Sequence, residues 1–346
     1  MAQPTTAMTD TALASNGVIA AAHTDSNLLN AWGLAAAPGG PFWIADNNSN
    51  KSTLYDGNGT PQSLVVSIPA GANGPANPTG QVYNGTTDFV ITTSTGSAPA
   101  QFIFSGEGGT ITGWAQSVSG MTATIAYDDA AGGAVYKGLA LANNGSANHL
   151  YATDLHNAKI DVFDTHFQKV TLSGTFADPM IPAGFAPFGI QLINNQLYVT
   201  YAKQDATAHD ETLGAGLGYV NVFDVNGNLV KRFASAGALN APWGIALAPS
   251  GFGSAAGKLL IGNFGDGIIN TFDPAMATHL GSISLGSGKQ LAVPGLWALA
   301  FGNGTASQPT GALFYTAGPN NQVDGVFGRV DVVTSTMPPP CTGYGC

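Results

Sequence analysis

Cysteine, positive charge and long apolar runs are all scarce in this chain, and each shortage excludes a class of protein. The 346 residues include only two cysteines, Cys341 and Cys346, which excludes a disulfide framework and a cysteine-based zinc cluster. Ten lysines and arginines face twenty acidic residues, for a formal charge of −10. Because nucleic acids are bound through clustered positive charge, DNA or RNA binding is excluded. No apolar run approaches the roughly 20 residues of a membrane-spanning helix.

The two cysteines lie in the terminal stretch PPPCTGYGC, which admits two interpretations. Either they form a disulfide around a small loop in an oxidising compartment, or the stretch is a flexible tail or linker. The acidic, lysine-poor composition is common in secreted bacterial proteins. The first residues, MAQPTTAMTD, do not have the pattern of a signal peptide. Maturation removes such a peptide, so its absence here is compatible with secretion. We therefore expect a secreted or periplasmic location.

Glycine, by contrast, is abundant, and three short motifs recur in a fixed order. The first is a bulky residue followed by glycine and an apolar alternation, as in AWGLA, YKGLALA, PFGIQL and PWGIALA. The second and third are short strands, such as FWIADN and LYATDL, then STLYDGNG and VNVFDVNG. A weaker fourth strand usually follows. Four short strands recurring about every 50 residues are typical of propeller blades. We predict an all-β fold, a six-bladed β-propeller of four-stranded antiparallel blades.

The repeats also suggest where the domain begins and ends. We expect an N-terminal tail at 1–16, the propeller at 17–334 and a Pro- and Cys-containing tail at 335–346. The sixth repeat lacks its fourth strand. The strand-like segment GVIAAAH, residues 17–23, is expected to supply that strand and close the ring. Closure matters because an open ring would leave unpaired strand edges.

Several of these segments resemble a known type of repeat. NAWGLA, LNAPWGIALAP, YVTYAKQDA followed by HD, and GNFGDGIINTFD are similar to NHL-type propeller repeats. They most resemble those of a group of uncharacterised secreted bacterial propeller proteins, over about residues 27–333. The resemblance implies the propeller fold and a geometry in which inner-strand starts share one face with the loops between second and third strands. It implies no reaction.

One ring of candidate residues on that face precedes the repeated glycine. Its members are Trp32, Thr79, Lys137, Phe188, Trp243 and Trp297. One interpretation is that the aromatic residues pack between blades. The other is that they form a mouth that stacks on a sugar, an aromatic group or an apolar chain, with Lys137 pairing with an anion.

A second ring ends the second strands, and it includes Asp46, Asp154 and Asn263 on alternate blades. Oxygen ligands that converge on a channel suit Ca²⁺. The competing interpretation is that each of these side chains accepts hydrogen bonds within its own turn.

The loop after YVTY concentrates ionisable groups in an otherwise charge-poor chain. Lys203, Asp205, His209, Asp210 and Glu211 fall within nine positions, and the whole loop, 202–218, is far longer than a hairpin needs. Such loops are functional or disordered.

Three interpretations of this loop remain open. His209 and Glu211, with His156 from a neighbouring loop, are candidate ligands for Ca²⁺ or a transition metal. His209 and Asp210 are a candidate acid–base pair. The third interpretation is a solvated, salt-bridged loop.

These observations favour a secreted propeller that binds a small-molecule, glycan or protein ligand on its loop-rich face. Trp32, Phe188, Trp243 and Trp297 would stack on the ligand, and Lys137, Lys203 and Asp205 would add polar contacts. One alternative is a metal-dependent hydrolase, lactonase or lyase with a cation near the channel mouth. Another is an interaction or surface-assembly module. The sequence does not fix the oligomeric state.

Overall fold

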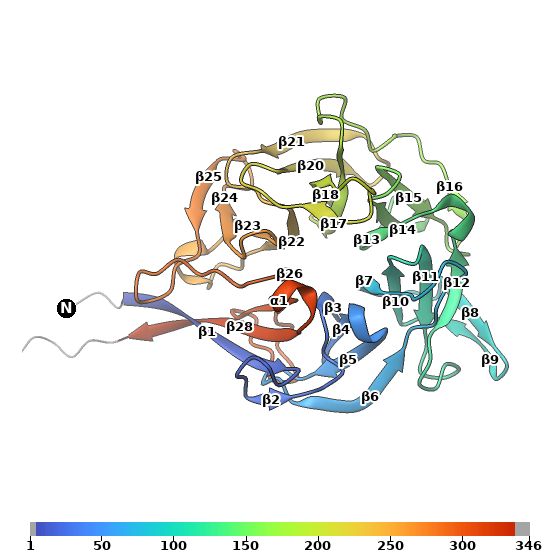
Figure 1. The fold of residues 1–346 in the computed structure, drawn as a ribbon, viewed down its shortest axis with the longest axis horizontal. Coiled ribbons are helices and arrows are strands. Elements are labelled where there is room, and N and C mark those ends of the chain that lie inside the picture. The colour runs from blue at the N-terminus through green and yellow to red at the C-terminus, as the bar shows by residue number, and fades with distance from the viewer. Residues whose placement is uncertain (1–4, 336–346) are drawn as a thin grey trace, which may run out of the picture.

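The chain forms six β-sheets arranged in a ring around a central axis (Figure 1). The computed structural model describes residues 5–335. Four main antiparallel strands make up each sheet and follow one another from the axis to the rim. The predicted six-bladed β-propeller is confirmed. No helix within residues 5–335 has the length and apolar character needed to cross a membrane.

The blades are numbered along the chain, and their strands are given from the axis outward. Blades 1 and 2 contain β3 (Ala31–Ala36), β4 (Phe42–Asp46), β5 (Lys51–Tyr55) and β6 (Pro61–Ser67), then β7 (Pro78–Tyr83), β10 (Phe102–Gly106), β11 (Thr110–Trp114) and β12 (Thr124–Asp128). Blades 3 and 4 contain β13 (Tyr136–Asn143), β14 (Asn148–Asp154), β15 (Lys159–Phe163) and β16 (Lys169–Val170), then β17 (Phe185–Ile193), β18 (Gln196–Gln204), β20 (Gly218–Asp224) and β21 (Leu229–Ser235). Blades 5 and 6 contain β22 (Pro242–Leu247), β23 (Leu259–Asn263), β24 (Ile269–Phe272) and β25 (His279–Ser282), then β26 (Leu296–Phe301), β27 (Leu313–Ala317), β28 (Val326–Ser335) and β1 (Thr5–Ser15).

Several short strands and helical turns lie outside the four main strands of each blade. The two-residue β2 pairs with β1, β8 and β9 form a hairpin inserted in blade 2, and β19 pairs with β18 in blade 4. Their bounds, with those of the helical turns, are β2 (His23–Thr24), β8 (Val90–Thr93), β9 (Gly96–Pro99), β19 (Glu211–Thr212), η1 (Asn47–Ser49), η2 (Ala130–Gly132), η3 (Gly253–Ala255) and α1 (Pro319–Gln322).

The repeated glycine is explained by crowding where the inner strands converge. A Cβ atom on Gly189 would lie 2.2 Å from the carbonyl oxygen of Trp243 on the next inner strand. On Gly33 it would lie 2.4 Å from the carbonyl oxygen of Thr79. The equivalent glycines of blades 2, 3 and 5 meet the neighbouring backbone in the same way. Because only glycine lacks this atom, the motif permits six inner strands to approach one axis.

The N-terminal segment closes the ring, but not with the predicted residues. β1 pairs antiparallel with β28, from Thr5 opposite Ser335 to Ser15 opposite Val326. The two strands, blue and red, lie side by side in Figure 1. The assignment of the closing strand to residues 17–23 is therefore wrong, and Val18 in that segment is exposed. β1 was missed because its sequence, TTAMTDTALAS, is dominated by threonine and alanine and offers little apolar alternation.

Apolar side chains fill the spaces between neighbouring blades. Between blades 2 and 3, for example, Ile103 and Ile111 pack in one buried cluster with Leu139 and Leu150. This packing fixes each blade against the next, so the loops at the ends of the strands are held on a rigid support.

Candidate functional site

The predicted aromatic ring fills the centre of the molecule. Trp32 stacks on Trp297 with ring centroids 3.5 Å apart, and Trp243 lies edge-on to Trp32 at 5.8 Å. Phe188 approaches Trp297 edge-on at 6.0 Å. None of the four side chains exceeds 9% exposure. We call them the aromatic plug. Their faces cover one another, so stacking on a ligand would require the plug to open.

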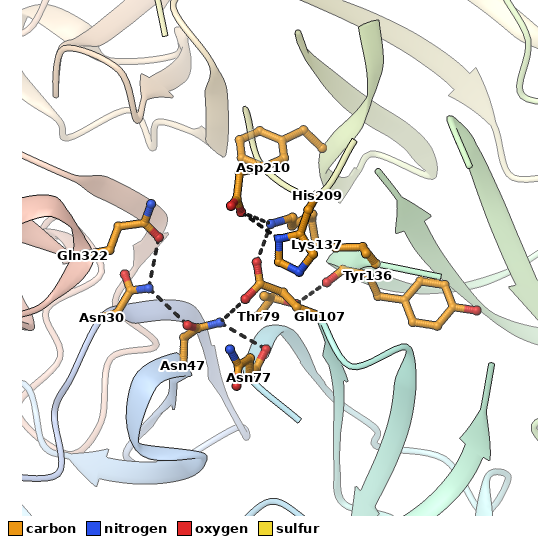
Figure 2. Close-up of polar contacts among 12 residues, drawn as sticks. Asn30, Asn47, Asn77, Thr79, Glu107, Tyr136, Lys137, His209, Asp210 and Gln322 are labelled. Atoms are coloured by element: carbon orange, nitrogen blue, oxygen red, sulfur yellow. Dashed lines mark hydrogen bonds and ion pairs between the residues drawn. The ribbon is translucent and has the colours of Figure 1, made fainter. Parts of the chain in front are cut away.

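Lys137 lies on top of this plug and is completely buried. Its Nζ atom is 5.2 Å from the centre of the Trp32 ring, within range of a cation–π interaction. It forms ion pairs with Glu107, in the turn between β10 and β11, and with Asp210, 3.3 Å away (Figure 2). Burial lowers the pKa of this ammonium, but the surrounding carboxylates outweigh burial and leave its pKa raised. Lys137 therefore stays charged and holds two loops from different blades together.

Asp210 also pairs with its neighbour His209, and these two residues are the candidate acid–base pair of the sequence. The Nδ1 atom of His209 lies 3.2 Å from Oδ1 of Asp210, and the two side chains are 48% and 55% exposed. The hydrogen bond from His209 is the main cause that lowers the pKa of Asp210 to about 2. The same bond raises the pKa of His209. This pair is the most accessible charged part of the site.

Asp205 organises the loop that carries this pair. Its Oδ1 atom accepts hydrogen bonds from the backbone N–H groups of Thr207 and His209, at 3.1 and 3.0 Å. The carboxylate of Asp205 therefore stabilises its own turn through these hydrogen bonds. Lys203, in the same loop, is exposed.

Glu211 follows Asp210 and turns into the protein. It begins β19, which pairs with β18, and only 9% of the residue is exposed. Burial raises the pKa of Glu211 to about 7, even though the nearby charge of Lys137 lowers it. At neutral pH this carboxyl group is consequently close to half protonated.

This raised pKa makes stability depend on pH in a defined direction. The usual pKa is 4.5, so between pH 4.5 and 7 the folded protein binds more protons at Glu211 than the unfolded chain, and stability falls as pH rises. We expect Glu211→Gln to remove the fall in stability that ionisation of this carboxyl group causes. The variant should be more stable than the unsubstituted protein by roughly 3 kcal/mol at about pH 8, with little difference near pH 4. Urea unfolding of both proteins across this range measures the difference. Parallel stability curves would contradict it.

Amide side chains complete the site on the opposite side of the axis from this loop. Asn47 donates from Nδ2 to Glu107 at 2.9 Å, and its Oδ1 accepts from Asn30 at 3.2 Å (Figure 2). Asn30 also donates to Gln322 of α1 at 3.1 Å and accepts from Nε1 of Trp297 at 3.0 Å. These bonds tie the aromatic plug to the polar layer above it.

We call the polar layer the cap. Its members are Asn30, Asn47, Glu107, Lys137, His209, Asp210, Glu211 and Gln322.

Sequence reasoning missed the amides and Glu107. A signal was present for Asn30 and Asn77, which stand three residues before the repeated glycine in NAWG and NPTG. Both have left-handed backbones, with φ of 48° and 44°, as does Ala241 at the start of blade 5. Asparagine tolerates this conformation better than most residues, so a repeated asparagine there marks the entry to an inner strand. Glu107 sits in SGEGG, which reads as an ordinary turn.

The second-strand ring does not converge on one ion. Asp46 accepts from Thr53 at 2.8 Å within blade 1, and Asp154 accepts from Asn157 at 2.7 Å within blade 3. Asn263 donates to the carbonyl oxygen of Ala238, in the loop that leads into blade 5, at 2.8 Å. Each side chain is hydrogen-bonded near its own strand, but only Asp154 accepts from its own turn, as the competing interpretation expected. His156 is exposed in the turn after β14.

Two clusters bring potential metal-ligating atoms within 4.8 Å of one another in the described part of the chain. One comprises Glu107, His209 and Asp210 in the cap, and the other comprises Asp129, Asp154 and Asp161 in blade 3. Two lysines already pair with the second cluster: Lys169 lies 2.7 Å from Asp129 and 2.6 Å from Asp161, and Lys159 lies 2.9 Å from Asp161. The cap cluster is the only one with an accessible side.

Taken together, the ring of blades and the cap define a six-bladed β-propeller with a polar site over a plugged centre. The chain is 33% identical to an uncharacterized protein of Acanthamoeba polyphaga mimivirus over 325 residues, which cover 92% of this chain and 78% of the viral protein. A second uncharacterized protein of the same virus is 33% identical over 328 residues, covering 92% and 84%. The chain belongs to the family of these viral proteins. No protein-family model matches it. Membership of the bacterial group suggested by the motifs stays a prediction.

Solved structures share the fold at low sequence identity. An α-L-arabinofuranosidase of Fusarium graminearum in complex with arabinobiose matches with a TM-score of 0.54 at 11% identity, over 90% of this chain and 94% of that chain. The PQQ-bound aldose sugar dehydrogenase of Streptomyces coelicolor matches with a TM-score of 0.50 at 12% identity, over 96% and 100%. These likenesses support the propeller fold alone.

Proposed function

We propose that the protein binds a small, neutral, hydroxyl-rich ligand of the saccharide class at the cap. The observation that carries this proposal is the charge arrangement around Lys137. The one cation of the cluster that is always charged is buried beneath its partners, whereas Asp210 and His209 face solvent. A ligand that approaches the cap meets the carboxylate of Asp210, a hydrogen-bond acceptor, and the imidazole of His209 first. Hydroxyl groups donate to such acceptors without bringing in a charge.

The charge of the whole chain also disfavours an anionic ligand. The formal charge is −10, and the buried ammonium of Lys137 already pairs with two carboxylates. An anion would therefore meet a repulsive field, and the ammonium of Lys137 is already paired. The earlier idea that Lys137 pairs with an anionic ligand loses its physical basis.

A calorimetric titration tests this function. We expect at least one neutral mono- or disaccharide to bind in the micromolar to millimolar range. Sugars that contain arabinose, glucose or galactose are the first to test, because an aldose sugar dehydrogenase and an α-L-arabinofuranosidase share this fold. Asp210→Asn and His209→Ala should each weaken binding about tenfold. His166→Ala is the matched control, because His166 is exposed in the turn between β15 and β16, away from the cap. Binding that survives both cap substitutions would refute the proposal.

A metal-dependent activity is the second candidate, and one observation favours it. Glu107, His209 and Asp210 offer one nitrogen and two carboxylate oxygens within 4.8 Å, a donor set suited to a divalent cation. The ammonium of Lys137 opposes it, since it contacts both carboxylates and would repel a second cation. The same titrations, repeated with EDTA and with added Ca²⁺ or Zn²⁺, separate the two functions. Stoichiometric metal in the native protein that is lost in His209→Ala would favour the metal site.

A further inference from the structure

One hydrogen-bonded chain of six side chains crosses the cap (Figure 2). From one end to the other it consists of Asp210, Lys137, Glu107, Asn47, Asn30 and Gln322. Every link joins a donor to an acceptor, because the ammonium and the two asparagine amides donate in both directions or toward the carboxylates. The chain therefore ends in an acceptor, the carboxylate of Asp210, and in the amide group of Gln322.

The aromatic plug sets the direction of the amide links. The indole nitrogen of Trp297 can only donate, and it donates to Oδ1 of Asn30 at 3.0 Å. The amide nitrogen of Asn30 must therefore face Asn47 and Gln322, to which it donates at 3.2 and 3.1 Å. Gln322 in turn has to present its oxygen to Asn30. Its Nε2 atom, a donor, is left at the end of the chain.

This donor can be reached from solvent. Within residues 5–335, the Nε2 atom of Gln322 donates to no other atom, since the hydrogen bonds of this residue use its two oxygens. The residue is partly exposed, and Nε2 is not one of the buried polar atoms that lack a partner in the same residues. In Figure 2 the oxygen of this amide faces Asn30, and the nitrogen turns the other way. The nitrogen is therefore available to a ligand.

An uncommon backbone turn holds Gln322 in this position. Asn320, Asn321 and Gln322 all have left-handed backbones, with φ of 55°, 57° and 66°. Asparagine adopts this conformation as a single residue, but three successive residues other than glycine are rare because each Cβ atom approaches a carbonyl oxygen. Asn48 fastens the turn, since its Nδ2 atom donates to the carbonyl oxygen of Gln322 at 2.6 Å. Backbone strain of this kind clusters at ligand sites.

We propose that Gln322 is a specificity-determining residue of the cap, whose Nε2 atom donates to an oxygen atom of the bound saccharide. This inference rests on the proposed function and extends it to the second end of the hydrogen-bonded chain. The two ends require opposite groups, because Asp210 accepts from a hydroxyl group and Gln322 donates to a hydroxyl or ring oxygen. Saccharide hydroxyls both donate and accept, so a saccharide satisfies both ends, whereas a ligand with acceptors alone satisfies only Gln322.

Gln322→Glu tests this donor, because it exchanges the nitrogen for an acceptor and keeps the shape of the side chain. A carboxylate oxygen can still accept from Asn30, so the melting temperature should stay within about 2 °C. In calorimetry with L-arabinose, D-glucose and D-galactose, each sugar that binds the unsubstituted protein should bind this variant at least about tenfold more weakly. Asn321→Asp is the matched control, because it makes the same exchange on an exposed neighbour in the same turn. It should leave the affinity unchanged.

A spectroscopic measurement on the unsubstituted protein complements the affinities. The side-chain amide resonance of Gln322 in a nitrogen–proton NMR spectrum is identified by its absence from the spectrum of Gln322→Glu. We expect this resonance to shift when a binding sugar saturates the protein, because the amide gains an acceptor. A residue that only supports the fold would give no such shift, and the measurement needs no stable variant other than the one used for identification.

Three results would overturn the role of Gln322 while a sugar still binds and Asp210→Asn still weakens it. They are an unchanged affinity in Gln322→Glu, an equal loss of affinity in Asn321→Asp, and an amide resonance that does not move. In each case the proposed function stands and this inference falls. If none of the sugars binds the unsubstituted protein, the proposed function fails and the inference fails with it.

Discussion

Replacing Lys137 with methionine is expected to lower the free energy of unfolding by about 3–5 kcal/mol. Methionine keeps the apolar stem that packs over Trp32, so the loss reports the missing charge rather than an empty space. Glu107, whose side chain is 8% exposed, would remain buried without its cation. Asp210 is half-exposed and would suffer much less, because water can solvate it. Urea unfolding at neutral pH measures the change.

The double substitution Lys137→Met with Glu107→Gln is the control for this result. It removes both charges, and the glutamine oxygen can still accept from Asn47. We expect it to recover at least about half of the lost stability, since the larger penalty comes from the unpaired carboxylate. A loss below about 1 kcal/mol in the single variant would mean that Glu107 reaches solvent once Lys137 is gone.

Removal of residues 1–15 is expected to have a comparable or larger effect. The deletion exposes the edge of β28 along ten paired positions and strips Met8, Leu13 and Ala14 from the core. Burial of the two larger side chains alone contributes roughly 3–6 kcal/mol. The lost strand pairing adds to this, and an open edge promotes association between molecules. Thermal unfolding and light scattering should therefore show a protein that melts at least about 10 °C lower and self-associates.

A synthetic peptide of residues 5–15 provides the matching control. If β1 acts by completing blade 6, the peptide should bind to the truncated protein and restore most of its melting temperature. A peptide with proline at position 9 should not, because proline cannot donate within the β1–β28 ladder. A truncated protein that stays monomeric at the original melting temperature would show that the ring does not depend on this strand.

The fold was predictable because its geometry constrains individual residues. Five inner strands need glycine at the same position, because a Cβ atom there would lie 2.2–2.8 Å from the neighbouring backbone. This steric requirement produces a glycine repeat that is visible in the sequence. β1 carries no such constraint. It completes a blade at the rim through backbone pairing, which threonine and alanine satisfy as well as bulkier residues. The inner strands were therefore predictable from the sequence, whereas β1, which completes blade 6 at the rim, was not.

The candidate site was predictable only in part. Lys137, His209, Asp210 and Glu211 were expected on one face, and the structure brings them together there. The sequence did not reveal that Lys137 lies beneath its partners or that Glu107 holds it, because both facts depend on how loops from different blades fold toward the axis. Asp46 and Asp154 look like ligands in sequence, yet Asp46 accepts from Thr53 on the neighbouring strand and Asp154 accepts from Asn157 in its own turn. Spacing along the chain does not distinguish these cases.

The seam between β1 and β28 has a consequence for synthesis on the ribosome. β1 must wait for a partner strand that lies more than 300 residues later in the chain. Blades 1 to 5 can assemble in order as they appear, each against the one before. Blade 6 can be finished only after translation has passed residue 335, so a nascent chain held at any earlier point exposes two unpaired strand edges.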